Sequence, residues 1–70
     1  MNITDPNAAR RLIDQWRSAP PAAQLRNLRL ARETLELDQM YYEQKGNHGG
    51  VARCEECLQL LRERVAELQG

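Results

Sequence analysis

Three side chains with metal-binding or redox chemistry lie close together in the sequence: His48, Cys54 and Cys57. Nitrogen and sulfur ligands at such spacings occur in zinc sites, and a Cys-x-x-Cys pair at the start of a helix can have a lowered thiol pKa. A zinc site would need a fourth ligand, however, and Glu55 and Glu56 between the thiols oppose a lower pKa. Both cysteines also fit the apolar repeat of a helix, so we expect them to pack in the core as small apolar residues.

Few residues of this sequence are of a type and spacing that would support catalysis. The single histidine lies in a glycine-rich segment, whereas general acid–base catalysis needs a positioned partner and a pocket. The sequence has no pattern of a nucleophilic triad, of paired carboxylates at a defined spacing, or of a phosphate-binding glycine loop. We therefore predict a protein that is not an enzyme and that uses no metal or other cofactor.

The length of 70 residues fits one domain, residues 1–70. A chain this short buries only ~60% of the surface that its unfolded form exposes, so self-association or a partner is expected to add stability. Two cysteines are too few for a disulfide framework. No signal-like segment opens the sequence, and no apolar run approaches the ~20 residues that span a bilayer. We expect a cytoplasmic protein without membrane contact.

Charge is unevenly distributed, although ten basic and ten acidic residues cancel. Residues 1–32 carry a net charge of +4, and residues 33–70 carry −4. Two interpretations remain open: solvated helix faces, or a basic region that meets an acidic surface, including that of another copy. Nine of the ten basic residues are arginine, which suits bidentate contacts and also fits a GC-rich bacterial or phage genome.

The sequence predicts an all-α fold with three helices, at residues 6–18, 20–45 and 51–69. Asp5 and Pro6 form a start signal, an N-cap followed by proline at the first helical position. Proline also opens the second helix at Pro20, with Ser18 or Ala19 as the cap. Gly46 is placed to close that helix in the left-handed conformation. Residues 47–50 are then expected to form a flexible turn.

The second and third helices are predicted to form a long antiparallel hairpin, because only a short turn joins them. Each carries an apolar stripe at helical spacing. The two predicted seams consist of Leu25, Leu28, Ala31, Leu35 and Tyr42 on the second helix, and of Val51, Cys54, Cys57, Leu58, Leu61, Val65 and Leu68 on the third. The short first helix is expected to pack on part of this hairpin through Leu12, Ile13 and Trp16.

A second apolar face on the long helix is the main functional signal. Leu30, Leu37 and Tyr41 lie ~120–180° around the helix from the seam, and Leu60 lies off the seam of the third helix. Scattered exposed leucines are ordinary, but we favour a helix–helix interface with a second copy or a different protein. The predicted partner-binding residues are Leu30, Leu37, Tyr41, Leu60, Arg26 and Arg29, and a homodimer is expected.

Nucleic-acid binding is the alternative function, because arginines are concentrated in the first half of the chain. Against it, the net charge is zero, and the second helix is too long for a simple helix-turn-helix reader. Two of these arginines also have i,i+4 acidic partners, in the pairs Arg29–Glu33 and Arg32–Glu36. The candidate nucleic-acid-binding residues are Arg10, Arg11, Arg17, Arg26, Arg29 and Arg32.

Two resemblances accompany these patterns. Residues 41–47 (YYEQKGN) and 54–60 (CEECLQL) resemble the turn and second helix of a tetratricopeptide repeat. The preceding helix is far too long for that repeat, and a single repeat is not stable alone, so we interpret the likeness as shared hairpin geometry. In size and layout the chain resembles small helical chaperones of bacterial secretion systems and small phage-encoded inhibitors. We therefore expect a bacterial or phage regulator, inhibitor or assembly chaperone that binds another protein.

Overall fold

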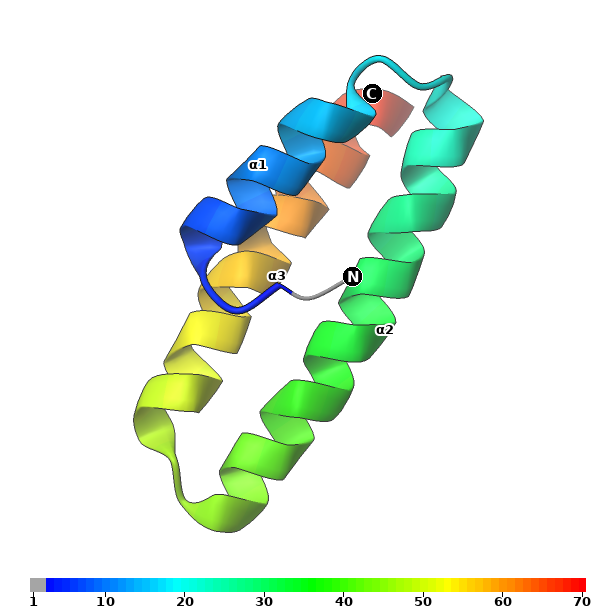
Figure 1. The fold of residues 1–70 in the computed structure, drawn as a ribbon. Coiled ribbons are helices and arrows are strands. Elements are labelled where there is room, and N and C mark those ends of the chain that lie inside the picture. Colours follow the sequence, from blue (N-terminus) through cyan, green and yellow to red (C-terminus); the bar gives the residue numbers. More distant parts are fainter. Residues whose placement is uncertain (1–2) are drawn as a thin grey trace.

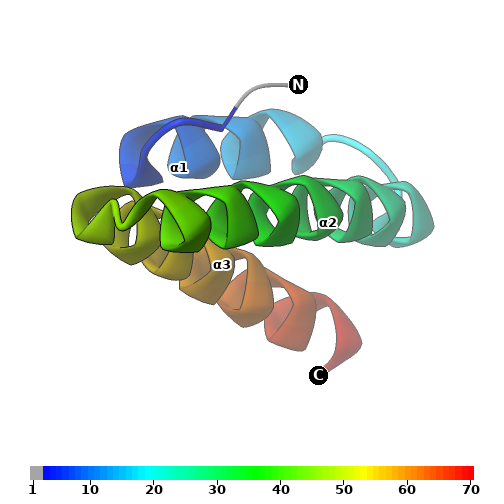
Figure 2. The same ribbon diagram turned by 90° about the horizontal axis from the view of Figure 1, so that it is seen from below.

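The structure, a computed structural model, describes residues 3–70 and contains three α-helices and no strand within that range (Figure 1). The helices are α1 (Pro6–Trp16), α2 (Pro21–Lys45) and α3 (His48–Gln69). The long helices α2 and α3 run antiparallel, and the shorter α1 runs alongside them (Figures 1 and 2). The predicted all-α, three-helix arrangement is confirmed.

The first helix begins as its sequence predicts. The Asp5 carboxylate accepts a hydrogen bond from the backbone N–H of Ala8 at 2.8 Å, which satisfies one of the unpaired donors at a helix start. Pro6 follows in the first turn, where its missing N–H costs nothing. The helix ends at Trp16, two residues before the predicted end.

The second helix begins at Pro21 and not at the predicted Pro20. Pro20 is extended (φ −58°, ψ 151°), because the proline that follows it disfavours the helical conformation. Neither Ser18 nor Ala19 caps the helix; the Ser18 hydroxyl donates to the carbonyl of Gln15 at 3.3 Å. At the other end, Gly46 adopts the predicted left-handed conformation with φ 70°.

The connection between α2 and α3 is shorter than predicted, because α3 begins at His48. The expected flexible turn over residues 47–50 is therefore wrong for its last three residues. Asn47 explains the early start: its side-chain oxygen accepts the backbone N–H of Gly50 at 2.9 Å, as an N-cap side chain does.

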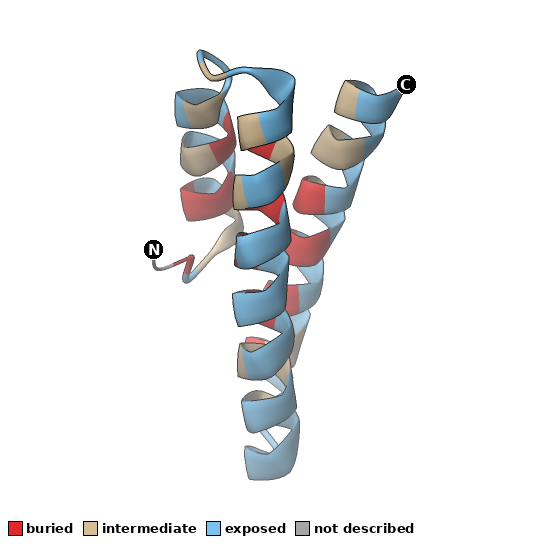
Figure 3. Cartoon of the chain, turned by 90° about the vertical axis from the view of Figure 1, so that its right-hand side faces the viewer, coloured by how far each residue is buried: buried red, intermediate tan, exposed pale blue. Residues whose placement is uncertain are grey.

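Gly50 is buried at the closed end of the hairpin, directly against the ring of Tyr42. A Cβ atom at this position would lie 2.5 Å from Cγ of Tyr42, closer than two carbon atoms that are not bonded to each other can approach. The absence of a side chain thus lets α2 and α3 meet tightly here. Towards the other end of the hairpin the two helices diverge (Figures 2 and 3).

The core lies between the three helices and confirms the predicted seams. Leu28, Ala31 and Leu35 of α2 are buried, with Leu25 and Tyr42 half-buried at the two ends of their seam. On the third helix the buried seam residues are Cys54, Cys57, Leu58 and Leu61. The first helix contributes Ala8, Ala9 and Ile13 to this core, with Leu12 and Trp16 packed against it. Because α1 packs mainly against α3, it leaves the outward face of α2 uncovered (Figure 3).

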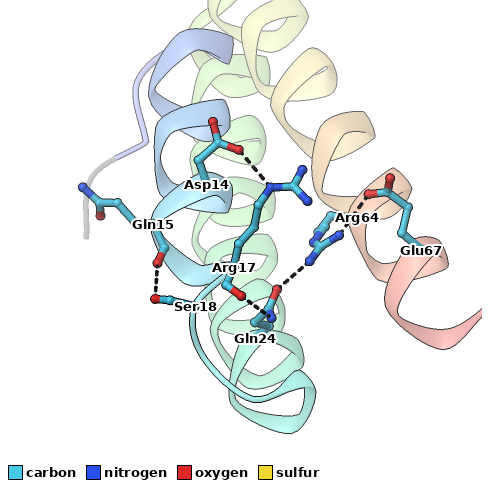
Figure 4. A network of polar contacts seen from close by, with 7 residues as sticks. All are labelled: Asp14, Gln15, Arg17, Ser18, Gln24, Arg64 and Glu67. Carbon is cyan, nitrogen blue, oxygen red and sulfur yellow. Dashed lines mark hydrogen bonds and ion pairs between the residues drawn. The ribbon is translucent and has the colours of Figure 1, made fainter.

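A polar network ties the three helices together at the open end of the hairpin (Figure 4). At its centre, Gln24 is only 4% exposed. The Gln24 amide nitrogen donates to the carbonyl of Ala19 at 2.7 Å and to that of Arg17 at 3.4 Å. The Gln24 side-chain oxygen accepts from Nη2 of Arg64 at 2.9 Å. One buried amide therefore joins the end of α1, the start of α2 and the last turns of α3, a link that the sequence analysis did not predict.

Candidate protein-interaction surfaces

Four large apolar side chains lie exposed on the outward face of α2, and we call them the α2 stripe. Their exposed fractions are 47% for Leu30, 67% for Leu37, 56% for Met40 and 57% for Tyr41. At 100° per residue they share an arc of about 100° on the helix surface. The stripe extends over about 17 Å of α2, on the side turned away from the core (Figure 3).

Three of these four residues are predicted from the sequence as an exposed apolar face, and Met40 was not among them. A usable signal was present, because Met40 follows Leu37 by three residues and so shares its side of the helix. At the end of the stripe, Nζ of Lys45 lies 5.7 Å from the centroid of the Tyr41 ring, within the range of a cation–π interaction. The stripe is thus bounded by a basic residue at its C-terminal end.

Leu60 does not belong to the α2 stripe, although it was predicted near the same interface. It is half-buried and lines a hollow between α1 and α3, together with Ile13 and Arg17. The reason is the position of α1, which packs against α3 and covers this side of it. Leu60 is therefore not part of the exposed apolar face of α2.

A groove of about 720 Å³ runs between the first half of α2 and the second half of α3, where the two helices diverge (Figure 2). No residue of α1 lines it. Its floor is apolar and includes Leu25 and Leu28 of α2 with Leu61 and Val65 of α3. Leu25 and Val65 are only half-buried, so part of this apolar floor remains accessible.

The rim of this groove is basic, and we call the whole feature the arginine groove. Arg26, Arg29 and Arg32 project from α2 and Arg62 from α3, and no acidic residue lines the groove. Arg32 is paired with Glu36 at 3.8 Å. Within residues 3–70, the other three rim arginines form no ion pair. The predicted partner-binding residues Arg26 and Arg29 therefore lie beside an apolar groove, with their charges available to a ligand.

The six arginines proposed for nucleic-acid binding do not all line the same hollow. Arg26, Arg29 and Arg32 line the arginine groove, whereas Arg10 and Arg17 line the separate hollow between α1 and α3, beside Glu63 and Glu67. Arg17 is also paired with Asp14, at 3.0 Å, and Arg11 lines neither feature. Of the two predicted i,i+4 pairs, Arg32–Glu36 is present, and Arg29–Glu33 does not form among the described residues. The six arginines are therefore divided between two hollows and the surface outside them.

The side chains of His48, Cys54 and Cys57 do not converge on a common site. His48 is exposed at the first position of α3, whereas Cys54 and Cys57 are free thiols in the core, 5% and 1% exposed. Between residues 3 and 70, no group of three or more His, Cys, Asp or Glu side chains is placed to hold a metal ion. The prediction that both cysteines serve as core residues is confirmed.

The two thiols are expected to react slowly in the folded protein. Burial raises the pKa of both, and the carboxylate of Asp38 raises that of Cys54 further. The reactive species is the thiolate, so a disulfide reagent at pH 7.5 should label the native chain at least about tenfold more slowly than the chain in guanidinium. Rapid labelling of the native chain would contradict the buried placement.

Because the fold raises the pKa of both thiols, the free energy of unfolding should decrease as the pH rises into the alkaline range. The fold favours the neutral thiols, so their stabilising contribution is present below the pH at which exposed thiols ionise, about 8.5. It is lost as the pH rises above that value towards the folded-state pKa. Urea denaturation at increasing alkaline pH, with a Cys54→Ala variant as the control, measures this loss.

Comparisons of this chain with known protein families, with curated proteins and with solved structures found no match. Among the described residues, no helix has both the length and the apolar character needed to cross a lipid bilayer. The surfaces described above are therefore the basis for a functional proposal.

Proposed function

We propose that this chain is a non-catalytic protein-interaction module, of the regulator, inhibitor or assembly-chaperone kind, and that its α2 stripe pairs with a second copy. The observation that carries the proposal is the exposure of four large apolar side chains on one face of α2. Single exposed leucines are common on soluble domains, but a contiguous exposed apolar face of this kind is typical of an interaction site.

The free energy gained by burying the α2 stripe in a dimer is consistent with a modest affinity. Burial of an aliphatic side chain contributes about 1.5–3 kcal/mol relative to exposure. A two-fold contact uses the same stripe twice, but part of this gain is offset by the entropy of association and of ordered side chains. A Kd in the micromolar range follows, which corresponds to about 8 kcal/mol.

The distribution of charge along α2 favours an antiparallel pairing. The first half of the helix carries Arg26, Arg29 and Arg32, whereas the second half carries Glu33, Glu36, Asp38 and Glu43. An antiparallel arrangement places each basic half beside an acidic half, whereas a parallel arrangement places like charges together. Such complementarity contributes orientation and specificity more than affinity.

Replacement of Leu37 with glutamate should convert the dimer into a folded monomer. Leu37 is the most exposed member of the α2 stripe, so a carboxylate there leaves the core intact, whereas its burial in a dimer would require desolvation of a charge. Sedimentation equilibrium should show an increase in Kd of at least about tenfold, with an unchanged circular dichroism spectrum.

The matched control is Ala52→Glu, which adds the same charge at an exposed position of α3 outside the stripe. This variant should dimerise like the unmodified chain. If the unmodified chain sediments as a monomer at about 100 µM, the proposed self-association is wrong, because its expected Kd is lower than that concentration.

A further inference from the structure

We infer that the arginine groove of one copy receives the acidic second half of α2 from the other copy, and that the two copies exchange these halves reciprocally. The inference rests on the proposed self-association and adds the surface that the second half of each α2 enters. Its starting point is that groove and stripe both lie on α2, the groove along residues 22–32 and most of the stripe along residues 33–43.

The groove and the proposed occupant have matching lengths. The arginine groove runs along residues 22–32 of α2 and 58–69 of α3, which is about 15 Å along each helix. Residues 33–43 of α2 form a continuous helical segment of the same length. A crevice between two diverging helices accepts a third helix by the packing of side-chain ridges into grooves.

The arginine groove and residues 33–43 of α2 are complementary both in apolar surface and in charge. The apolar floor, with Leu25 and Val65 half-exposed, can receive Met40, which has 56% of its surface exposed and follows Glu36 by one helical turn. The basic rim has no acidic neighbour in the groove, whereas residues 33–43 carry four acidic residues and no basic one. Arginine and carboxylate groups form strong bidentate contacts when brought together.

A single two-fold rotation places the second half of each α2 beside the groove of the other copy. A two-fold axis between Arg32 and Glu33, with the two α2 helices antiparallel, places Glu36 opposite Arg29 of the second copy. The same axis places Met40 opposite Leu25, a half-buried residue in the floor of the groove on the same side of α2. Because each copy gives and receives the same segment, the assembly closes as a dimer and does not extend into a filament.

A second copy suits the arginine groove better than a nucleic acid does. Phosphate groups would use the arginine rim but would leave the apolar floor exposed to water, and nucleic-acid contacts are mainly to phosphate and sugar. The α2 segment uses both the rim and the floor. This chain thus carries its own complementary ligand.

The test is a charge exchange between Arg29 and Glu36, made in two separate variants. Arg29→Glu places a carboxylate on the rim, and Glu36→Arg places a guanidinium on the incoming helix. Both positions are exposed, and the only ion pair that either forms among the described residues, Arg32–Glu36, lies on the surface and contributes little to stability. Each variant alone should dimerise at least about tenfold more weakly, because both interfaces of its homodimer then bring like charges together.

An equimolar mixture of the two variants should recover dimerisation. In the mixed dimer one interface keeps the original pair of charges, and the other has the same pair with its charges exchanged. Arg11→Glu, at an exposed arginine outside the groove, is the control and should leave Kd unchanged. Sedimentation equilibrium of each variant and of the mixture, with circular dichroism to check folding, provides the measurement.

The alternative outcomes separate this inference from the proposed function. If the chain dimerises and Leu37→Glu dissociates it, but Arg29→Glu has no effect, the self-association stands and the groove is not its receiving surface. If the unmodified chain is a monomer, both proposals fail. If it is a monomer that binds a 20-base-pair duplex of random sequence, and Arg29→Glu weakens that binding, the groove serves phosphate groups instead.

Discussion

Replacement of Gly50 with alanine is expected to destabilise the fold by about 3 kcal/mol, the upper part of the range for overpacked sites. The added Cβ would lie 2.5, 2.6 and 2.9 Å from three carbon atoms of the Tyr42 ring. Rotation of the ring about its Cβ–Cγ bond leaves Cγ in place, and rotation about the Cα–Cβ bond would move the half-buried ring out of its site. Relief therefore requires the ring to leave its site or α2 and α3 to separate, and either change loosens the closed end of the hairpin.

Gly49 provides a matched control one residue earlier in the same helix. A Cβ there would meet only Nη1 of Arg53 at 3.6 Å and Oδ1 of Asn47 at 3.7 Å, both ordinary contacts. Gly49→Ala is therefore expected to stabilise the fold by about 0.5 kcal/mol, because alanine loses less backbone entropy than glycine in a helix. Urea denaturation at one fixed protein concentration gives both values.

A third variant isolates the contact that Gly50 makes. Tyr42→Ala in the Gly50→Ala background should recover part of the lost stability, because alanine lacks the Cγ, Cδ1 and Cδ2 atoms that meet the new methyl group. The coupling between the two positions should be about 1 kcal/mol or more, as for other residues in contact. Additive effects of the two replacements would contradict the close approach of α2 and α3 at this point.

Replacement of Gln24 with leucine is expected to cost about 2–3 kcal/mol, although it keeps a side chain of similar size in a buried position. The amide that is lost accepts from Arg64 and donates to the carbonyl of Ala19. The side chain of Arg64 is only 14% exposed, and its Nε already lacks a partner. Loss of the amide therefore leaves a poorly solvated guanidinium with still fewer hydrogen bonds.

Two further variants separate this polar network from other effects of the substitution. Gln59→Leu removes an amide from an exposed surface, where Gln59 donates to Glu63 at 3.3 Å, and should change stability by no more than about 0.5 kcal/mol. In the double variant Gln24→Leu/Arg64→Leu the buried guanidinium is also absent, so part of the loss should be recovered. A neutral effect of Gln24→Leu alone would show that the network does not hold the open end of the hairpin together.

Local signals were sufficient to predict the helices and the face of α2 that lies exposed. The Asp5 cap, the left-handed Gly46 and the apolar seams all depend on residues within about four positions of each other, where backbone hydrogen bonds and side-chain spacing decide the conformation. The errors at the ends of the elements are also local. Pro20 is extended because Pro21 follows it, and Asn47 caps α3 through Gly50.

Only the tertiary structure decided how the helix faces are covered. Gln24 and Arg64 are 40 residues apart in the sequence, and their contact depends on the spacing of α2 and α3 at the open end. The same spacing creates the arginine groove, and the packing of α1 against α3 covers Leu60.

The physical reason for this division is the range over which each interaction acts. Periodicity determines which side of a helix is apolar, but the neighbour that covers that side is selected by the volumes of side chains distant in sequence, because a core must be densely packed. At Gly50 the deciding contact is the ring of Tyr42 across the hairpin. The sequence alone therefore determined three amphipathic helices and an unpaired apolar face, whereas packing determined where the helices touch, where they diverge and which charges surround the gap.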